Sequence, residues 1–594
     1  MIIGIIGDNI DFLISSVSFL HRPIVGVFTS PELSNILLLL LYRSDKLFLI
    51  YNISIIFIAC LNAIFIYKFY KHFSAFSFVI PVALTLFVLF SPYSFYRFRD
   101  HFLLSNIWIV ILFMHYVLFY SKLNRTFNYI YLTLFLLLIS LFSNYYGFFS
   151  LIFFILFIIL KLFIAKIITI RIVSFHFIKN SLMGIICYII IFVFWLLIFK
   201  LLNLGNNNIT QTLSLITLSR PLEDFFTFTS RPWYYFLPSI DNPFFGGITK
   251  NAIDWLQNDW GYFLTNNYFP TEHSASYLGW VNFIFALFGF RYIWRKVSIQ
   301  KSHKVWTREM DVLTLGFVAI FLVIITMPPF FTISGLKIYM PSFLLWKLFP
   351  MFRVLARLGI IILLIELIFT GYGYVTFLDF IKLKISSSKL RIKRFLLKKW
   401  GVVSFFIILP FFILSLMEFY VPIYFTDVNT APSVFTYVKN NTPTNAVLVT
   451  YPVNKAGDTF FWIREYKRAL INPPGYNKPE DGYNFLDFTS NLITCKGILE
   501  ARNLGATYLV YYYKADKTPD VSFKFFDNTN LLIKEKKFDY SNPDMKDLGW
   551  LNTYIKIIDM GNVIDNSAIL YRINDKIDYE SEKEKCLSNL PIVK

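Results

Sequence analysis

The chain has 594 residues, of which 56% are hydrophobic, 20% aromatic and only 16% charged. Ordinary soluble proteins do not have this composition, so we predict an integral membrane protein. The net charge of +19 would suggest a nucleic-acid partner for a soluble protein, but the position of the charges excludes it here. The four cysteines exclude a disulfide scaffold and a four-thiolate zinc module, because Cys60 and Cys187 lie in apolar runs. Only Cys495 and Cys586 could pair.

Apolar stretches of about 20 residues recur along the first 420 positions. A bilayer core needs about that many residues per helix, because backbone groups there must be satisfied within the helix. We predict ten spans, at residues 47–67, 74–92, 102–120, 127–145, 147–165, 181–202, 276–294, 311–329, 358–380 and 401–420.

The connecting segments alternate in charge. Lys and Arg accumulate on the cytoplasmic side of membrane proteins. Five alternate connectors hold 22 basic residues and only two acidic ones, Glu309 and Asp311; they are residues 68–73, 121–126, 161–180, 291–311 and 381–400. They carry the whole net excess, so we predict that they face the cytoplasm. All other connectors and both termini then face outward, which an even number of spans requires.

This topology divides the chain into three parts. We expect an outward N-terminal segment (1–46), a transmembrane bundle (47–420) with a large outward loop (203–275), and an extracytoplasmic tail (421–594). The turn 93–101 and the connector 330–357 also face outward.

The tail shows signals of both strands and helices. A short helix is predicted over 498–504, where Gly505 provides a stop. Runs rich in β-branched and aromatic residues predict four strands, at 446–451, 506–513, 553–558 and 568–573. The predicted fold is therefore a polytopic α-helical membrane protein with a C-terminal α/β extracytoplasmic domain.

Acidic residues on the outward side are candidates for chemistry. Asp8 and Asp11 lie in an apolar stretch and would share a face of a helix. A carboxylate there could act as a general base toward a sugar hydroxyl or hold a divalent metal. The alternative is a solvated N-terminal turn or a helix cap.

A second candidate site is the outward turn that contains Arg97, Arg99, Asp100 and His101. Ionisable groups confined to the bilayer edge are costly unless they are paired or functional. Alternatively, the arginines reach lipid phosphates and Asp100 caps the next helix.

The third candidate is the arginine pair Arg353 and Arg357, which precedes the span at 358–380. Arginines four residues apart lie on one helical face and could hold a lipid phosphate through forked hydrogen bonds. In the long loop, Glu272 and His273 accompany tryptophans and tyrosines that suit stacking on sugar rings. An aromatic belt at the membrane interface would give the same composition.

Several short motifs occur in an order that resembles the GT-C superfamily of membrane glycosyltransferases, and most of all its YfhO-like members. Relatives in this group include protein mannosyltransferases, aminoarabinose transferases and oligosaccharyltransferase. The motifs are the Gly-Asp of 7–8 followed by Asp11, the Ser-Pro-Tyr of 91–93 leading to His101, the Asn-Tyr-Tyr-Gly of 144–147, the Glu-His-Ser-Ala-Ser-Tyr-Leu-Gly of 272–279, the Phe-Arg-x-x-x-Arg of 352–357, and the tail segments 433–439 and 447–452.

The resemblance implies an inverting transfer from a polyprenyl-phosphate sugar to a glycan, lipid or protein acceptor on the outer face of the cytoplasmic membrane. Asp8 would be the catalytic base, with Asp11 less suited to that role, and Asp100 beside His101 would contact substrate or metal. Arg353 and Arg357 would contact the donor phosphate. A divalent metal (Mg²⁺ or Mn²⁺) held by Asp8, Asp100 and His101 stays an open alternative, and no nucleic acid is expected.

The family has a helix before its Gly-Asp loop, whereas this chain has seven residues before Asp8. Either a first helix is missing from the sequence or the protein never had one.

Two alternative functions remain open. One is a transporter or flippase for lipid-linked glycans, for which Glu366 is the clearest acid within a span. The other is a non-catalytic assembly protein that binds partners through its tail.

Overall fold

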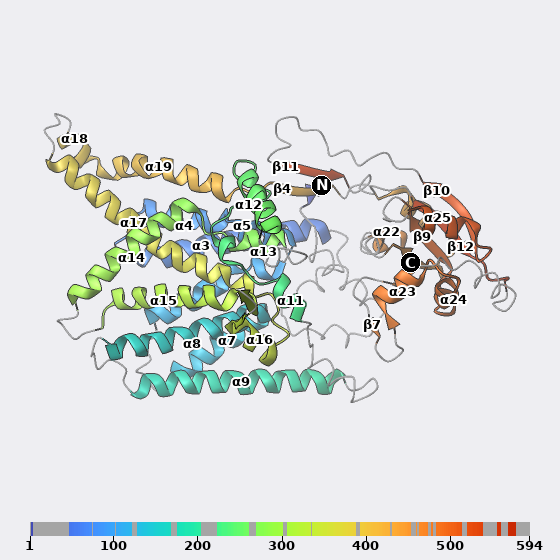
Figure 1. Ribbon diagram of the computed structural model, residues 1–594, viewed down its shortest axis with the longest axis horizontal. Coiled ribbons are helices and arrows are strands. Elements are labelled where there is room, and N and C mark those ends of the chain that lie inside the picture. Colours follow the sequence, from blue (N-terminus) through green and yellow to red (C-terminus); the bar gives the residue numbers. More distant parts are fainter. Residues whose placement is uncertain are drawn as a thin grey trace. The chain divides into compact units, whose positions relative to one another are not determined.

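The computed structural model (Figure 1) contains two compact units. One consists of the residues described between 49 and 422, and the other of those from 423 onward together with 2–3 and 47–48. The structure describes residues 2–3, 47–73, 75–100, 102–120, 128–167, 175–203, 222–259, 269–300, 306–333, 336–387, 393–427, 431–452, 459, 462–472, 477–478, 483–513, 519–538, 555–559 and 568–577.

The first unit is a helical bundle, and each of the ten predicted spans overlaps one of its helices. The long helices are α3 (Leu47–Lys71), α4 (Val79–Leu89), α6 (Ile107–His115, continued by a π-helical turn to Tyr120), α7 (Asn128–Phe142), α8 (Asn144–Ile167), α9 (Phe175–Asn203), α14 (Trp280–Gln300), α15 (Arg308–Thr326), α17 (Gly359–Ser387) and α19 (Trp400–Phe419).

Five helices in the described part of the chain are long and apolar enough to cross a membrane, within α3, α8, α15, α17 and α19. A sixth span results if α4 and the following short helix, which is bent from it by 48°, count as one. The total of ten stays a prediction.

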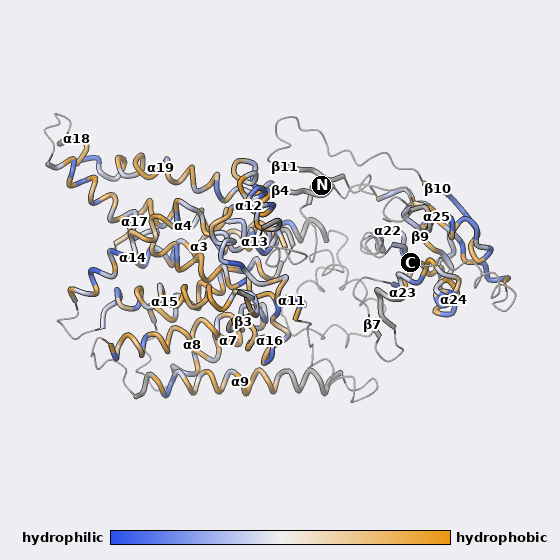
Figure 2. The backbone as a smooth tube through the Cα atoms, viewed as in Figure 1, coloured by the Kyte–Doolittle hydropathy of each residue, from blue (hydrophilic) through white to orange (hydrophobic). Residues whose placement is uncertain are grey.

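The outer surface of the bundle is apolar. On α9, Leu182, Ile186, Ile190 and Phe194 follow one another at intervals of four residues, and each is between 50% and 61% exposed. An exposed stripe of this kind would be unstable in water but suits contact with lipid tails. Hydrophobic residues run along most helices of the bundle (Figure 2). The unit is therefore a multi-pass membrane bundle.

Helix α17 forms the centre of the bundle, since 94% of its most apolar window is buried. It packs against α14 with almost no space between the backbones. A Cβ atom on Gly289 would lie 1.9 Å from the Phe369 carbonyl oxygen, and one on Gly373 would lie 2.0 Å from that of Phe285. Small residues allow such close helix contacts in membranes, where tight packing replaces the hydrophobic effect between helices.

The two ends of the bundle differ. The C-terminal ends of α8, α14 and α17 and the N-terminal ends of α15 and α19 lie at one end, on the left of Figure 1. The connectors between them are the ones that the sequence makes basic.

The short elements gather at the opposite end (Figure 1). They include α5 (Pro92–Asp100), η3 (Phe102–Ser105), α11 (Leu222–Thr227), η5 (Pro232–Tyr235), α12 (Gly246–Asp259), α13 (Pro270–Ser276), the hairpin β2 (Phe330–Ile333) and β3 (Leu336–Tyr339), α16 (Pro341–Leu348) and η7 (Leu355–Leu358). Helix α18 (Lys393–Lys398) lies at the basic end.

The prediction of a turn at 93–101 was wrong, because most of this segment is the helix α5. Pro92 occupies the first helical position, where its missing N–H is not needed. The Ser91 hydroxyl accepts a hydrogen bond from the Ser94 N–H at 3.3 Å, as an N-cap residue does. The pair Ser-Pro is therefore a helix start.

The second unit contains a five-stranded sheet in the order β10-β12-β9-β5-β6. Its strands are β5 (Val447–Tyr451), β6 (Ala469–Leu470), β9 (Tyr508–Tyr512), β10 (Leu532–Phe538) and β12 (Ala568–Ile573). A second sheet joins β1 (Ile2–Ile3), β4 (Ile423–Asp427) and β11 (Ile555–Asp559), and β7 (Asn477–Lys478) pairs with β8 (Tyr483–Asn484). The helices are α20 (Ser433–Asn441), α22 (Ile463–Tyr466), α23 (Phe485–Asn491), α24 (Cys495–Asn503) and α25 (Pro519–Asn528).

The α/β character of the tail is thus confirmed, and each of the four predicted strands overlaps an observed one. The predicted helix is α24, and Gly505 after it has a φ of +95°, a conformation that glycine adopts without strain. Cys495 is disulfide-bonded, whereas Cys60 and Cys187 are free. Cys586 lies outside the described residues.

Candidate functional site

The candidate site lies at the end of the bundle that holds the short elements. Helix α13 packs there against α5, η5, η7 and the start of α17. These elements come from segments far apart in the sequence, and each contributes polar side chains to a buried interior.

The centre of the site is Glu272 on α13, a carboxylate that is 1% exposed. Nη2 of Arg97, on α5, donates to its Oε2 at 2.7 Å. Nε of Arg357, on η7, lies 3.5 Å from its Oε1. The structure therefore brings together three of the predicted site residues, and it does so from the segments 93–101 and 330–357 and from the long loop.

Aromatic rings surround the two arginines. The Arg97 guanidinium lies 5.0 Å from the centroid of the Tyr93 ring, and that of Arg357 lies 4.8 Å from the Tyr145 ring. The hydroxyls of Tyr93 and Tyr146 are 3.1 Å apart, and the Tyr146 hydroxyl donates to the Leu104 carbonyl oxygen. The ring faces favour the cations and exclude water from them.

Guanidinium groups outnumber carboxylates among the described side chains of this cluster. Two guanidinium groups share one carboxylate, and Arg97 is fully buried. Within the described part of the chain, Nε and Nη1 of Arg97 have no hydrogen-bond partner. Buried donors without acceptors are costly. An anion with several acceptor oxygens, such as a phosphate, would accept hydrogen bonds from both nitrogens.

The loop after η5 fixes the position of α5. The Tyr96 hydroxyl donates to Oδ2 of Asp241 at 2.7 Å and lies 3.2 Å from the Ser239 hydroxyl. The Ser239 hydroxyl in turn accepts from the Ser274 hydroxyl on α13 at 2.9 Å. These bonds join α5 and α13, the helices that carry Arg97 and Glu272, so the geometry of the ion pair is set by its surroundings.

His273 contacts another part of the site, and its predicted role in substrate binding stays a prediction. Its ring is buried against Tyr234 at 4.5 Å, and its Nε2 lies 3.1 Å from the Leu237 carbonyl oxygen. Burial lowers the pKa of His273 to about 3, so the imidazole is neutral at physiological pH. Its neighbour Glu272 points in a different direction, because consecutive residues on a helix are about 100° apart.

Arg353 also differs from the prediction. It lies before η7, outside any helix or strand, and its Nη1 donates to Oδ2 of Asp224 on α11. Its guanidinium lies 4.9 Å from the Phe228 ring. The two arginines do not share a helical face, because the regular helix begins only at Gly359. Arg357 alone reaches Glu272.

The other predicted site residues cannot be placed against this cluster. Asp8, Asp11 and His101 lie outside the described residues, and the side chains of Arg99 and Asp100 are not described. Among the residues that the structure does describe, no group of three His, Cys, Asp or Glu side chains could hold a metal. The metal site that would use Asp8, Asp100 and His101 stays a prediction.

Sequence reasoning did not assign a role to Tyr93, Tyr145 and Tyr146. All three lie in motifs that the sequence analysis had noted, the Ser-Pro-Tyr start and the Tyr-Tyr-Gly break. A polar aromatic residue beside a helix break at the bilayer edge is a signal that could have indicated them.

No protein-family model matches the sequence, and no curated protein matches it. Among solved structures, the chain is similar to the archaeal oligosaccharyltransferase AglB from Archaeoglobus fulgidus in complex with an inhibitory peptide and a dolichol-phosphate, with 11% identity and a TM-score of 0.42 over 90% of this chain and 69% of that one. The Archaeoglobus fulgidus oligosaccharyltransferase in the apo form gives 12% identity and a TM-score of 0.42 over 87% and 67%. The YfhO-like assignment stays a prediction.

Proposed function

We propose that the protein is a membrane glycosyltransferase of the GT-C type whose donor is a polyprenyl-phosphate sugar. The observation that carries the proposal is the buried cluster of Arg97, Arg357 and Glu272, in which Nε and Nη1 of Arg97 have no hydrogen-bond partner among the described residues. A lipid-linked phosphate at the end of a membrane bundle offers acceptor oxygens to these two nitrogens, while its prenyl chain remains in the bilayer.

In this proposal the acceptor hydroxyl attacks the anomeric carbon of the sugar while the bond to the donor phosphate breaks. A carboxylate takes the hydroxyl proton, and inversion follows from attack on the face opposite the phosphate. Asp8 is our candidate for this base, with Asp11 and Asp100 as further acids of the site. The two arginines stabilise the charge that develops on the leaving phosphate.

We further propose that the site faces the outside of the cytoplasmic membrane. The basic connectors lie at the opposite end of the bundle, and the positive-inside rule places that end in the cytoplasm. The disulfide of Cys495 in the tail supports an oxidising, extracytoplasmic location of the tail domain. The acceptor is then a glycan, lipid or protein outside the membrane.

The experiment is a transfer assay with purified protein in lipid nanodiscs and a radiolabelled polyprenyl-phosphate sugar. We expect product with the wild type and a loss of at least a hundredfold in Arg97→Gln and Arg357→Gln. Lys347→Gln is the matched control, because Lys347 is an exposed cation on α16 at the same end of the bundle. Full activity in both arginine variants would refute the proposed site.

A transporter of lipid-linked glycans is the alternative that one observation favours. Within the described residues, neither carboxyl oxygen of the buried Glu366 on α17 has a hydrogen-bond partner, and intramembrane acids often lie on transport paths. Translocation of a lipid-linked glycan in liposomes, abolished in Glu366→Gln and without sugar transfer, would favour this alternative.

A further inference from the structure

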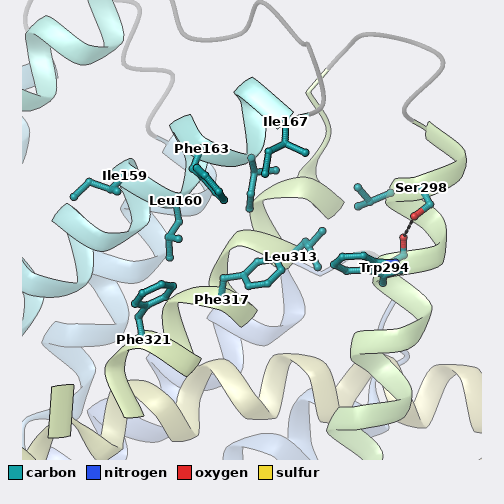
Figure 3. A pocket seen from close by; sticks show the side chains of 11 residues that line it. Ile159, Leu160, Phe163, Ile167, Trp294, Ser298, Leu313, Phe317 and Phe321 are labelled. Atoms are coloured by element: carbon teal, nitrogen blue, oxygen red, sulfur yellow. Dashed lines mark hydrogen bonds between the residues drawn. The ribbon is translucent and has the colours of Figure 1, made fainter. Parts of the chain in front are cut away.

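A second site lies between α8, α14 and α15 and shares no residue with the arginine cluster. Figure 3 shows the side chains that line it. It is a cavity of about 520 Å³. Among the described residues that line it, only Ser298 and Trp294 bring polar groups, a hydroxyl and an indole N–H. The Ser298 hydroxyl already donates to the Trp294 carbonyl oxygen. The lining residues are Ile159, Leu160, Phe163, Ile164, Ile167, Trp294, Val297, Ser298, Leu313, Phe317 and Phe321.

The cavity is a groove that opens toward the lipid. Five of its lining side chains lie between 44% and 60% exposed on the outer surface of the bundle: Ile159, Phe163, Ile167, Trp294 and Phe321. From Ile159 to Ile167 the groove follows α8 for about 12 Å, at about 1.5 Å per residue. Its shape and apolar lining suit one hydrocarbon chain that lies along the helices.

The mouth of the groove is basic. It lies where α8 and α14 end, at the end of the bundle with the basic connectors. In the sequence, residues 161–174 and 291–311 contain nine basic and two acidic residues. Both acids form ion pairs: Asp311 with Lys161 and Glu309 with Lys296, each at 2.7 Å.

Two cations beside the groove are therefore available to a ligand. Lys166 precedes Ile167 on α8, and Arg295 follows Trp294 on α14; both are exposed. Neither has an ion pair or hydrogen bond to any residue in the described part of the chain. An apolar groove in the bilayer with free cations at its mouth is complementary to a lipid with an anionic headgroup. Trp294 suits the level between the acyl chains and the headgroups.

We propose that this groove binds one anionic phospholipid of the cytoplasmic leaflet, with an acyl chain between α8, α14 and α15 and its phosphate at Arg295 and Lys166. The site differs from the donor site in its helices, in its end of the bundle and in its ligand. It does not depend on the proposed transferase activity.

Native mass spectrometry tests the proposal, with full-length protein released from nanodiscs that contain equal amounts of phosphatidylglycerol and phosphatidylcholine. We expect one phosphatidylglycerol to be retained in preference to phosphatidylcholine. Each cation near an anionic headgroup contributes roughly a fivefold gain in affinity, so Lys166→Gln with Arg295→Gln should weaken retention about 25-fold.

Ser298→Trp fills the mouth of the groove from an exposed position and should abolish retention while both cations are kept. Lys384→Gln is the matched control, since Lys384 is an exposed cation on α17 that does not line the groove, and it should change nothing. Unchanged thermal unfolding of the variants confirms that they fold. Equal retention of the two lipids, or retention of phosphatidylglycerol by either the double variant or Ser298→Trp, would overturn the proposal.

Discussion

Replacing Glu272 with glutamine tests whether the arginine cluster is a binding site for an anion or a purely structural ion pair. The substitution keeps the size of the side chain but removes the negative charge between Arg97 and Arg357. A buried ion pair that loses one partner typically costs about 3–5 kcal/mol of folding free energy. We therefore expect the variant without ligand to unfold at a clearly lower temperature than the wild type.

The effect on ligand binding should have the opposite sign. Glu272 repels a phosphate that lies beside the arginines; at a separation of roughly 7 Å and an effective dielectric constant of about 20, this repulsion is about 2 kcal/mol. Its removal should strengthen polyprenyl-phosphate binding roughly 30-fold. Arg97→Gln should instead weaken binding.

The assay is thermal unfolding in nanodiscs with and without polyprenyl phosphate. Ligand should restore more stability to Glu272→Gln than to the wild type, and least to Arg97→Gln. A ligand effect that is absent, or that has the same size in all three proteins, would show that the cluster is structural and that our reasoning is wrong.

Three further predictions concern the scaffold. Gly373→Leu should prevent folding of the bundle, because a side chain there meets the α14 backbone. Gly401→Leu is the control and should fold normally, since no atom lies within 4 Å of the added Cβ. Size-exclusion chromatography of the two variants checks both outcomes. Lowering the pH from 7.5 to 5 should lower the free energy of unfolding by about 2 kcal/mol through His273. The pKa of His273 is about 3 in the folded state, below the ordinary 6.5, so the unfolded chain takes up the proton first. His273→Gln should remove this part of the pH dependence of unfolding, and an unchanged dependence would contradict the assignment. Cys495→Ser should destabilise the tail domain by about 2–5 kcal/mol, and an equal mobility of the wild type on reducing and non-reducing gels would show that the disulfide is absent.

The helices could be predicted from the sequence because each membrane-spanning helix needs an apolar stretch of about 20 residues. Uninterrupted apolar stretches and basic connectors indicate where helices begin and end, and each predicted span overlaps a helix. The tail strands could be predicted because β-branched runs are bounded there by turn residues. The segment 93–101 was predicted wrongly because its charges indicated a loop, although Ser91 and Pro92 are a helix start.

The site could be predicted only in part. Arg97 and Arg357 were singled out for their charge at the bilayer edge, and Glu272 for its place among the aromatic residues of the long loop. Nothing in their spacing indicates that they meet, since they lie on three elements more than 80 residues apart in the sequence. The pairing of Arg353 with Asp224 and the burial of His273 depend on how the long loop packs. Periodicity does not encode such packing.

The most direct test of the central claim is a structure of the protein in nanodiscs with bound polyprenyl phosphate. Our account predicts the phosphate within hydrogen-bond distance of the Arg97 and Arg357 guanidinium groups, on the side of Arg97 away from Glu272. A lipid phosphate bound elsewhere, with the arginine cluster unchanged and closed, would contradict it.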